Sequence, residues 1–238
     1  NIVEGVLGGY GTPLMGPLPP GSGIESPALP DPATRIETAR LILDEAGWDY
    51  EEGAGWEKDG TVMPTITIRT SSVAELKLIA AAVQADWEAL GVPVEVELYE
   101  PGSLTQEVIR PRDYEALLFG EVIGRDRDLY AFWHSGQRKD PGLNIAVYAN
   151  ETVDALLSRI RTESDEEAKR ADLARVSGLI AEDYPAAFTH APDFLYAVPQ
   201  DVRGIVLPQI AAPADRFATV ATWHRYTEFV WPLLVSSK

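Results

Sequence analysis

The chain has 238 residues, of which 45% are apolar, and it carries a formal net charge of −17 at pH 7. This length predicts one large domain or one lobe of a larger protein, and the apolar fraction is ample for a core. The acidity argues against nucleic acid and anionic lipid as partners, since both bind basic patches. The absence of Cys excludes disulfides and thiolate metal sites. No apolar run reaches the roughly 18 residues of a membrane span.

The N-terminal part is rich in Gly and Pro, above all between residues 8 and 32. Proline fixes φ and lacks an amide proton, so these residues are predicted to be extended and without regular structure, after a short helix end at residues 1–7. The chain does not begin with Met and shows no signal peptide. We therefore expect Asn1 to be a boundary made by processing or by fragmentation.

A first helix is predicted to begin at Asp31 and Pro32. An Asp side chain can accept hydrogen bonds from the free amides of a helix start, and Pro fits the first helical position. Gly47 is suited to the helix end. Between these limits apolar residues recur at helical spacing, at Ile36, Ala39, Leu43 and Ala46. The polar, glycine-containing residues 49–62 predict a loop or hairpin.

A strand, a helix and a second strand follow. Residues 65–70 and residues 92–99 both alternate in polarity and are rich in β-branched side chains, which predicts two strands. Between them, Ser72 and Glu75 have the spacing of a capping box, and Gly91 ends an apolar helical stripe. This order predicts a βαβ unit, in which two parallel strands are joined by a right-handed crossover.

The second half of the chain continues the alternation of strands and helices. Residues 114–120 are apolar enough to predict a third strand that is buried on both faces. Capping boxes at residues 103–106 and 164–167 and an apolar stripe over residues 151–161 predict three helices. Residues 188–198 predict one or two short strands.

The C-terminal end is predicted to be irregular over residues 202–213 and is then rich in aromatic side chains. These aromatic residues are Phe217, Trp223, Tyr226, Phe229 and Trp231. Taken together, the elements predict an α/β fold, a mixed sheet flanked by helices.

Residues 120–150 form the densest run of aromatic, charged and turn-forming residues, and they follow the third predicted strand. Loops that leave a scaffold strand often carry ligand contacts. Within this run, Tyr130, Phe132, Trp133 and His134 stand together and could present an apolar platform to a peptide or a sugar. The alternative is that these rings fill the core of the lobe.

Catalytic and metal chemistry find little support in the sequence. The three histidines, His134, His190 and His224, lack the spacing of metal ligands, and we expect neither a metal nor a cofactor. No nucleophile elbow, P-loop or dinucleotide-binding motif occurs. An acid–base pair drawn from nearby carboxylates remains open as the signature of a hydrolase, although a solvated acidic loop is the simpler interpretation. These carboxylates are Glu121, Asp126 and Asp128.

Several segments, in this order, resemble a known family. They are ARLILDEAGW (residues 39–48), LKLIAAAVQADWEALGVPVEV in the βαβ unit, DYEALLFGEV (residues 113–122), DLYAFWHSGQ (residues 128–137), GLNIAVYANETVDALL (residues 142–157) and LIAEDYPAAFTHAPDFLYAV (residues 179–198). Together they resemble the C-terminal part of the family 5 extracellular solute-binding proteins, the dipeptide-, oligopeptide- and nickel-binding components of bacterial ABC importers.

The resemblance implies one lobe of a type II periplasmic-binding-protein-like fold, which closes with a second lobe on a solute by hinge motion. It implies a non-catalytic, extracellular or periplasmic protein, anchored to the membrane through the N-terminus of a longer parent protein, with permease subunits of the importer as partners. The expected parts are a Pro/Gly-rich leading segment (residues 1–30), the ligand-binding lobe (residues 31–200) and a return segment toward the N-terminal lobe of the parent (residues 201–238).

The resemblance also implies candidate ligand residues. In peptide-binding members an Asp after the third strand pairs with the α-ammonium of the ligand, and Ile123 stands at or near that position here. The nearby acids Glu121, Asp126 and Asp128 could supply the charge instead, or the ligand is a sugar or another small solute. Trp133, Ser135 and Asn144 match positions at the cleft edge and are candidate ligand or hinge residues. For Asn144 the alternative is a turn residue that bonds backbone groups nearby.

The leading hypothesis is therefore a solute-binding lobe of an importer that binds a peptide or a peptide-sized solute. A carboxylate-dependent hydrolase is the first competing class. The second is an interaction module in which the aromatic residues 223–231 dock a partner, and the partner we expect is the N-terminal lobe of the parent protein.

Overall fold

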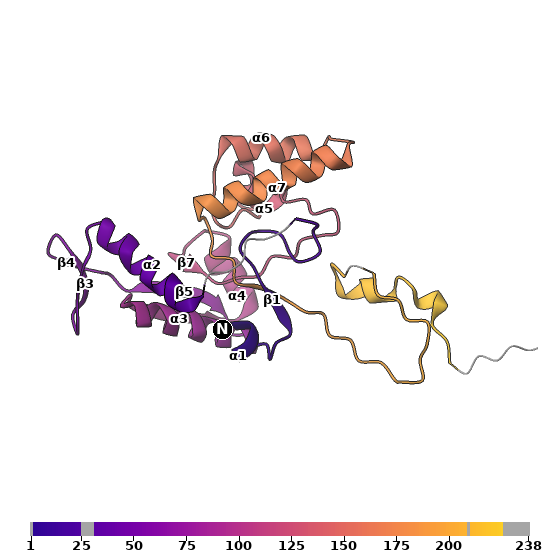
Figure 1. Cartoon of the computed structure of the whole chain (residues 1–238), viewed down its shortest axis with the longest axis horizontal. Helices are drawn as coiled ribbons and strands as arrows, with labels where there is room; N and C mark the ends of the chain where they lie inside the picture. The colour runs from indigo at the N-terminus through magenta and orange to yellow at the C-terminus, as the bar shows by residue number, and fades with distance from the viewer. Residues whose placement is uncertain (1, 25–30, 209, 226–238) are drawn as a thin grey trace, which may run out of the picture.

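A three-stranded parallel sheet forms the centre of the lobe (Figure 1). Strand β5 (Ile66–Ser71) lies between β6 (Val94–Tyr99) and β7 (Ala116–Leu117). The pairing of β5 with β6 is parallel over the whole length of both strands, so that Ile66 stands opposite Val94 and Ser71 opposite Tyr99. The predicted parallel pair is confirmed.

The structure is a computed structural model that describes residues 2–24, 31–208 and 210–225. The expectations placed on Tyr226, Phe229 and Trp231 lie outside the described residues. Within the part of the chain that is described, no helix combines the length and the apolar character needed to cross a bilayer.

Helix α3 (Ala74–Leu90) joins β5 to β6 and packs against both strands. Two residues of this helix, Ile79 and Ala80, are fully buried. Gly91 ends the helix as predicted, with φ at +93°, and a Cβ there would lie 2.5 Å from the ring of Tyr50. The position therefore requires glycine both for its backbone and for its close packing.

The capping box predicted at Ser72 is wrong. The N-cap of α3 is Val73, which has no side-chain cap, and the Ser72 hydroxyl donates instead to the carboxylate of Glu100 at 3.0 Å. The Ser72 hydroxyl cannot cap α3 and bond Glu100 in the same conformation. Glu100, in the loop that follows β6, is the partner that it bonds.

Helix α2 (Pro32–Glu45) begins as predicted, because the Asp31 carboxylate accepts a hydrogen bond from the Thr34 amide at 3.1 Å. Its apolar stripe is only partly buried: Leu43 packs against the core around Trp56, whereas Ile36 is exposed. The hairpin predicted over residues 49–62 is a small antiparallel sheet of three strands. These strands are β2 (Asp49–Glu51), β3 (Gly55–Lys58) and β4 (Thr61–Val62).

Between β6 and β7 the chain forms a helical segment, α4 (Pro101–Ser103) followed by the π-helical turn η1 (Leu104–Ile109). The cap predicted at Ser103 is wrong, since this segment begins after Glu100 and Ser103 makes no capping bond. The third strand is also shorter than predicted. Only the two residues of β7 pair, and they are partly exposed, because β7 is an edge strand with a neighbour on one side among the described residues.

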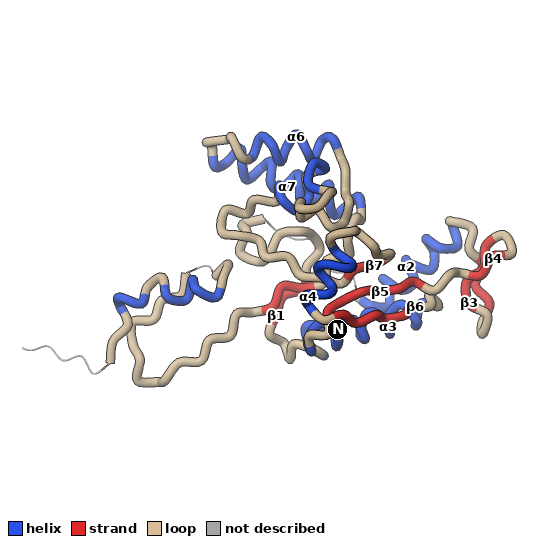
Figure 2. The backbone as a smooth tube through the Cα atoms, turned by 180° about the vertical axis from the view of Figure 1, so that it is seen from behind, coloured by secondary structure: helices blue, strands red, loops and turns tan. Residues whose placement is uncertain are grey.

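A second layer of helices stands on the other side of the sheet from α3 (Figures 1 and 2). It consists of α5 (Tyr130–Trp133), the 3₁₀ turn η2 (Ser135–Gln137), α6 (Glu151–Ile160) and α7 (Glu166–Asp183). The predicted helices over residues 151–161 and after residue 164 are confirmed, although Asp165 rather than Ser164 caps α7. Buried apolar residues of α6 and α7 form the largest core, to which Leu18 of the N-terminal segment contributes.

Two short strands tie the ends of the lobe together. In the N-terminal segment, β1 (Gly11–Pro13) follows the short helix α1 (Ile2–Gly5) and pairs antiparallel with β8 (His190–Pro192). A strand was not expected within residues 8–32, and it forms because β8 supplies the backbone partner. The short strand predicted within residues 188–198 is confirmed.

After β8 the chain leaves the lobe as a C-terminal arm, defined here as residues 194–208 and 210–225 (Figure 1). The arm carries the 3₁₀ turns η3 (Pro213–Phe217) and η4 (Val220–Thr222). Its own centre is a set of neighbouring rings, Phe194, Tyr196, Phe217 and Trp223. The guanidinium of Arg216 lies 4.4 Å from the centroid of the Phe217 ring and 5.1 Å from that of Tyr196.

Two neighbouring residues of α3 test how this helix is held. Ile79 is fully buried and Leu78 is 57% exposed. The change Ile79→Ala removes buried apolar volume and is expected to lower the free energy of unfolding by roughly 2–5 kcal/mol. The matched control Leu78→Ala should change it by no more than about 0.5 kcal/mol. Urea unfolding of both variants measures the difference, and equal losses would contradict the packing described.

Candidate functional site

The carboxyl ends of β5, β6 and β7 meet at one edge of the sheet, which we call the carboxyl edge (residues 71–73, 99–100 and 118–121). After β5 the chain turns into α3, whereas after β7 it runs to the helices on the opposite side of the sheet (Figure 1). Connections that diverge in this way leave a crevice between two adjacent strands, and ligands of open α/β sheets bind at such points.

Polar side chains of β5 line this edge and are held in place. The hydroxyl of the buried Thr70 donates to the Leu118 carbonyl at 2.8 Å, which fixes the end of β7 against β5. The buried Ser71 hydroxyl accepts from the Val73 amide at 3.3 Å. The turn from β5 into α3 is therefore rigid, and the following apolar residue Val73 is exposed beside it.

The loop that leaves β7, called here the site loop (residues 119–128), carries the carboxyl group whose pKa departs most from its ordinary value among the described residues. Burial raises the pKa of Glu121 to about 7. Among the described residues its carboxyl has neither a hydrogen-bond partner nor an ion-pair partner. On either side of it, Phe119 is 45% exposed and Val122 is 74% exposed. A half-buried acid flanked by exposed apolar side chains is the arrangement expected of a ligand contact.

A surface hollow of about 400 Å³ lies next to α3 at its N-terminal end, close to the carboxyl edge. Its walls come from α3 and from both segments that flank the lobe, with Glu75, Tyr10 and Asp193 as polar members. Nearby, burial lowers the pKa of His190, and the charge of Glu75 opposes that shift.

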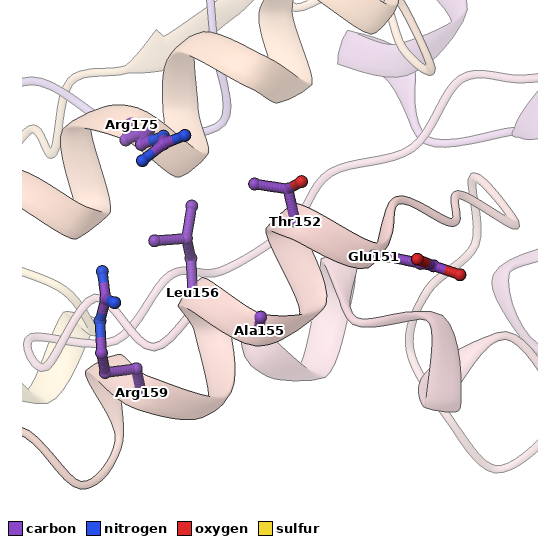
Figure 3. A pocket seen from close by; sticks show the side chains of 6 residues that line it. All are labelled: Glu151, Thr152, Ala155, Leu156, Arg159 and Arg175. Carbon is purple, nitrogen blue, oxygen red and sulfur yellow. The ribbon is translucent and has the colours of Figure 1, made fainter.

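A second hollow, of about 360 Å³, lies between α6 and α7 (Figure 3). It is lined by Glu151, Thr152, Ala155, Leu156, Arg159 and Arg175. The Arg159 side chain there donates two hydrogen bonds to Asp172, and these bonds, then the charge of Arg159, keep the pKa of Asp172 below its usual value. This arrangement joins α6 to α7 and lies apart from the carboxyl edge.

The three predicted acids have different surroundings. Asp126 is exposed. Asp128 accepts a hydrogen bond from the Tyr130 amide at 3.0 Å and pairs with Arg161 at 3.3 Å, so it holds the start of α5 against α6. Only Glu121 combines burial with the absence of a partner among the described residues. Ile123, where the family resemblance expects an Asp, packs against the helical core.

The three residues expected at the cleft edge are drawn into the packing of α5 and α6. Trp133 is 2% exposed and lies edge-on to Tyr148. The backbone amide and the hydroxyl of Ser135 both donate to the Asp154 carboxylate. Asn144 is fully buried, and its side chain bonds the backbone of His134 and Tyr148. The contacts of Asn144 are those of the turn-forming alternative.

Sequence reasoning missed Ser71 and Arg125. Ser71 is the last residue of the central strand β5, and this place would have indicated a site residue once the order of the three strands is known. Arg125 lies in the site loop and pairs with Asp215 of the arm at 2.9 Å. Nothing in the local sequence marks this contact, because its partner stands 90 residues further along the chain.

Comparison with known proteins places these features in a family. The family model of the bacterial extracellular solute-binding proteins, family 5 Middle, matches residues 1–140. The oligopeptide-binding protein AppA of Bacillus subtilis is 30% identical over 169 residues, which are 70% of this chain and 31% of the relative. The chain therefore belongs to the family 5 bacterial extracellular solute-binding proteins.

Solved structures show the same fold. The structure of AppA in complex with a nonapeptide superposes with a TM-score of 0.71 at 24% identity, covering 95% of this chain and 45% of AppA. The structure of NikZ from Campylobacter jejuni in complex with Ni(L-His) gives a TM-score of 0.71 at 20% identity, with 94% and 45% covered. The predicted α/β lobe of a periplasmic binding protein is confirmed, and the chain spans less than half the length of these relatives.

The raised pKa of Glu121 makes stability depend on pH. Its folded pKa of about 7 lies above the ordinary value of 4.5, so the folded state binds more protons between these values. The free energy of unfolding should fall as pH rises from about 4.5 to 7, by at most about 3 kcal/mol. We expect Glu121→Gln to be more stable than the wild type at pH 8 and equal to it near pH 4. Urea unfolding at several pH values measures this.

The exposed Glu95 provides the control for this experiment. The change Glu95→Gln controls for the loss of one carboxylate charge at an exposed position. A Glu121→Gln variant whose difference from the wild type does not grow with pH would contradict the burial of this carboxyl.

Asn144 offers a separate test of its structural role. The change Asn144→Ala leaves two buried carbonyls and one amide without their partner, and we expect a loss of roughly 2–4 kcal/mol in the free energy of unfolding. The neighbouring Leu143 is half exposed, and Leu143→Ala should be nearly neutral. Chemical denaturation of the two variants compares them directly. A neutral Asn144→Ala would restore the residue as a candidate for ligand contact.

Proposed function

We propose that this chain is the ligand-binding lobe of a longer solute-binding protein, which carries a peptide or another small solute to an ABC importer without catalysing a reaction. The observation that carries the proposal is Glu121, a half-buried carboxyl without a partner at the carboxyl edge of a lobe from this family. A cationic group of the ligand would give it the counter-charge that the described residues do not provide.

Peptide is the ligand class that fits this site best. A peptide brings an α-ammonium for Glu121 and apolar side chains for the exposed Phe119, Val122 and Val73. The nonapeptide complex of AppA supports this choice, and the Ni(L-His) complex of NikZ makes a small chelate the first alternative. Neutral sugars would leave Glu121 without a counter-charge.

The residues predicted at the cleft edge have supporting roles in this proposal. Asp128, Trp133, Ser135 and Asn144 hold α5 and α6 in place behind the site loop, and Asp126 is the second acid open to a ligand. The hydrolase alternative finds no acid–base pair here, because Asp128 is engaged with Arg161 and Asp126 is exposed.

The C-terminal arm is proposed to contact the N-terminal lobe of the parent protein. It exposes several large apolar side chains to solvent, and the relatives are more than twice as long as this chain. These exposed side chains are Leu195, Val206, Leu207 and Val220. Residues 1–30 and 201–238 then connect the two lobes, and residues 31–200 bind the ligand. The parent protein is extracellular or periplasmic and is anchored to the membrane through its N-terminus, where it meets the permease subunits.

The proposal is tested by thermal unfolding of the longer parent protein with di- to pentapeptides, simple sugars and nickel chelates. A ligand present at 100 times its dissociation constant should add about 2.7 kcal/mol to the free energy of unfolding. We expect stabilisation by peptides. Stabilisation by sugars alone would retain the transport role and remove the peptide assignment, and turnover of a glycoside would overturn the proposal.

The same protein gives a sharper test through pH. Pairing with an ammonium requires the ionised form of Glu121, whose pKa in the free protein is about 7. Affinity for a stabilising peptide should therefore fall about tenfold from pH 8 to pH 6. Calorimetry of the wild type and of Glu121→Gln measures this. We expect weaker binding and a flat pH profile in the variant, and an unchanged pH dependence would exclude Glu121 as the partner.

A further inference from the structure

Two basic side chains of the site loop bind the two segments that flank the lobe. Arg125 pairs with Asp215 of the C-terminal arm at 2.9 Å. Two residues further on, Arg127 donates to the Gly21 carbonyl of the N-terminal segment at 2.9 Å. These contacts span 90 and 106 residues of sequence, so they are tertiary contacts rather than features of the local turn.

The contact with the arm is well oriented on the side of Asp215. One carboxylate oxygen of Asp215 accepts from the amides of Ala211 and Ala212, both at 2.8 Å, and the other faces Arg125. These amides, and then Arg125, hold the pKa of Asp215 below its usual value, so it stays ionised near neutral pH. Arg125 therefore binds the first turn of η3, the part of the arm beside the ring cluster around Arg216.

The contact with the N-terminal segment depends on an unusual backbone conformation. Arg127 has φ at +54°, in the left-handed region that L residues other than glycine rarely adopt. Its amide donates to the Gly124 carbonyl at 3.0 Å and closes a turn. The acceptor Gly21 is exposed, but it lies next to Ser22, which is 2% exposed, and Leu18 of the same segment lies in the helical core.

We infer that Arg125 and Arg127 are positioning residues that couple the loop carrying Glu121 to the two segments through which this lobe connects to the rest of the parent protein. A change in the direction of the arm or of the N-terminal segment pulls on the site loop through these two side chains. The arrangement of the two lobes thereby adjusts how far Glu121 is exposed to a ligand. The coupling itself is independent of ligand identity, and its functional meaning rests on the proposed role of the site loop.

Amide hydrogen exchange of the 238-residue chain tests the coupling without any ligand. The change Asp215→Asn removes the charge on the arm that holds Arg125. We expect the Arg127 amide of the site loop to exchange at least about fivefold faster, with the amides of α7 unaffected. The conservative variant Arg125→Lys should keep the wild-type rate, since it retains the charge.

A matched control removes another ion pair of the arm. Arg225 pairs with Asp201 at 2.9 Å and has no contact with the site loop among the interactions described. Arg225→Gln should leave the exchange of the Arg127 amide unchanged. Equal exchange in the site loop of the wild type and of Asp215→Asn, with faster exchange in the arm of that variant, would overturn the inference.

The titration of Glu121, followed through its carboxyl carbon by NMR, separates positioning from simple charge effects. Removing the positive charge of Arg125 would by itself raise the pKa of a nearby acid. If Arg125 positions the loop, Arg125→Gln instead exposes Glu121, and its pKa should fall from about 7 toward the ordinary value of 4.5. A rise or no change would contradict the coupling. The proposed transport role would stand in that case, because it does not depend on Arg125.

Discussion

The pairing of β5 with a neighbour on each side is the constraint on which the rest of this lobe depends. With β6 on one side and β7 on the other, right-handed crossovers place the connection from β5 to β6 and the connection from β6 to β7 on opposite faces of the sheet. That divergence opens the carboxyl edge, and the bond from Thr70 to the Leu118 carbonyl keeps the two strand ends together. Glu121 stands three residues after Leu118, so it takes its position from the sheet.

The fold could be predicted where the signal is local and periodic. The unit β5–α3–β6 follows from alternation, an apolar stripe and Gly91, and Asp31 starts its helix by accepting a bond from the amide three residues away. The caps at Ser72 and Ser103 were predicted wrongly. The Ser72 hydroxyl donates to Glu100, which lies 28 residues away. A sequence pattern does not show that this distant acceptor replaces the local capping bond.

The candidate site could be predicted less well, because the role of each candidate residue depends on contacts with residues far away in the sequence. Glu121, Asp126 and Asp128 look alike in sequence, yet Arg161 engages Asp128 and the solvent surrounds Asp126. Only Glu121 keeps a half-buried carboxyl without a described partner. Burial also separates the two roles considered for the aromatic run: Trp133 fills the core with Tyr148 and Phe188, while Phe119 and Val122, which the pattern did not single out, are exposed beside the site.

The binding of a solute at the carboxyl edge is tested by a crystal structure of the longer parent protein, purified with the solute that it binds in its own host. We expect the solute at the carboxyl edge, with a cationic group within about 3 Å of the Glu121 carboxylate. Phe119 and Val122 should lie against its apolar part. A solute bound in the hollow between α6 and α7, or one that leaves Glu121 in contact with solvent alone, would show that Glu121 is not the ligand contact.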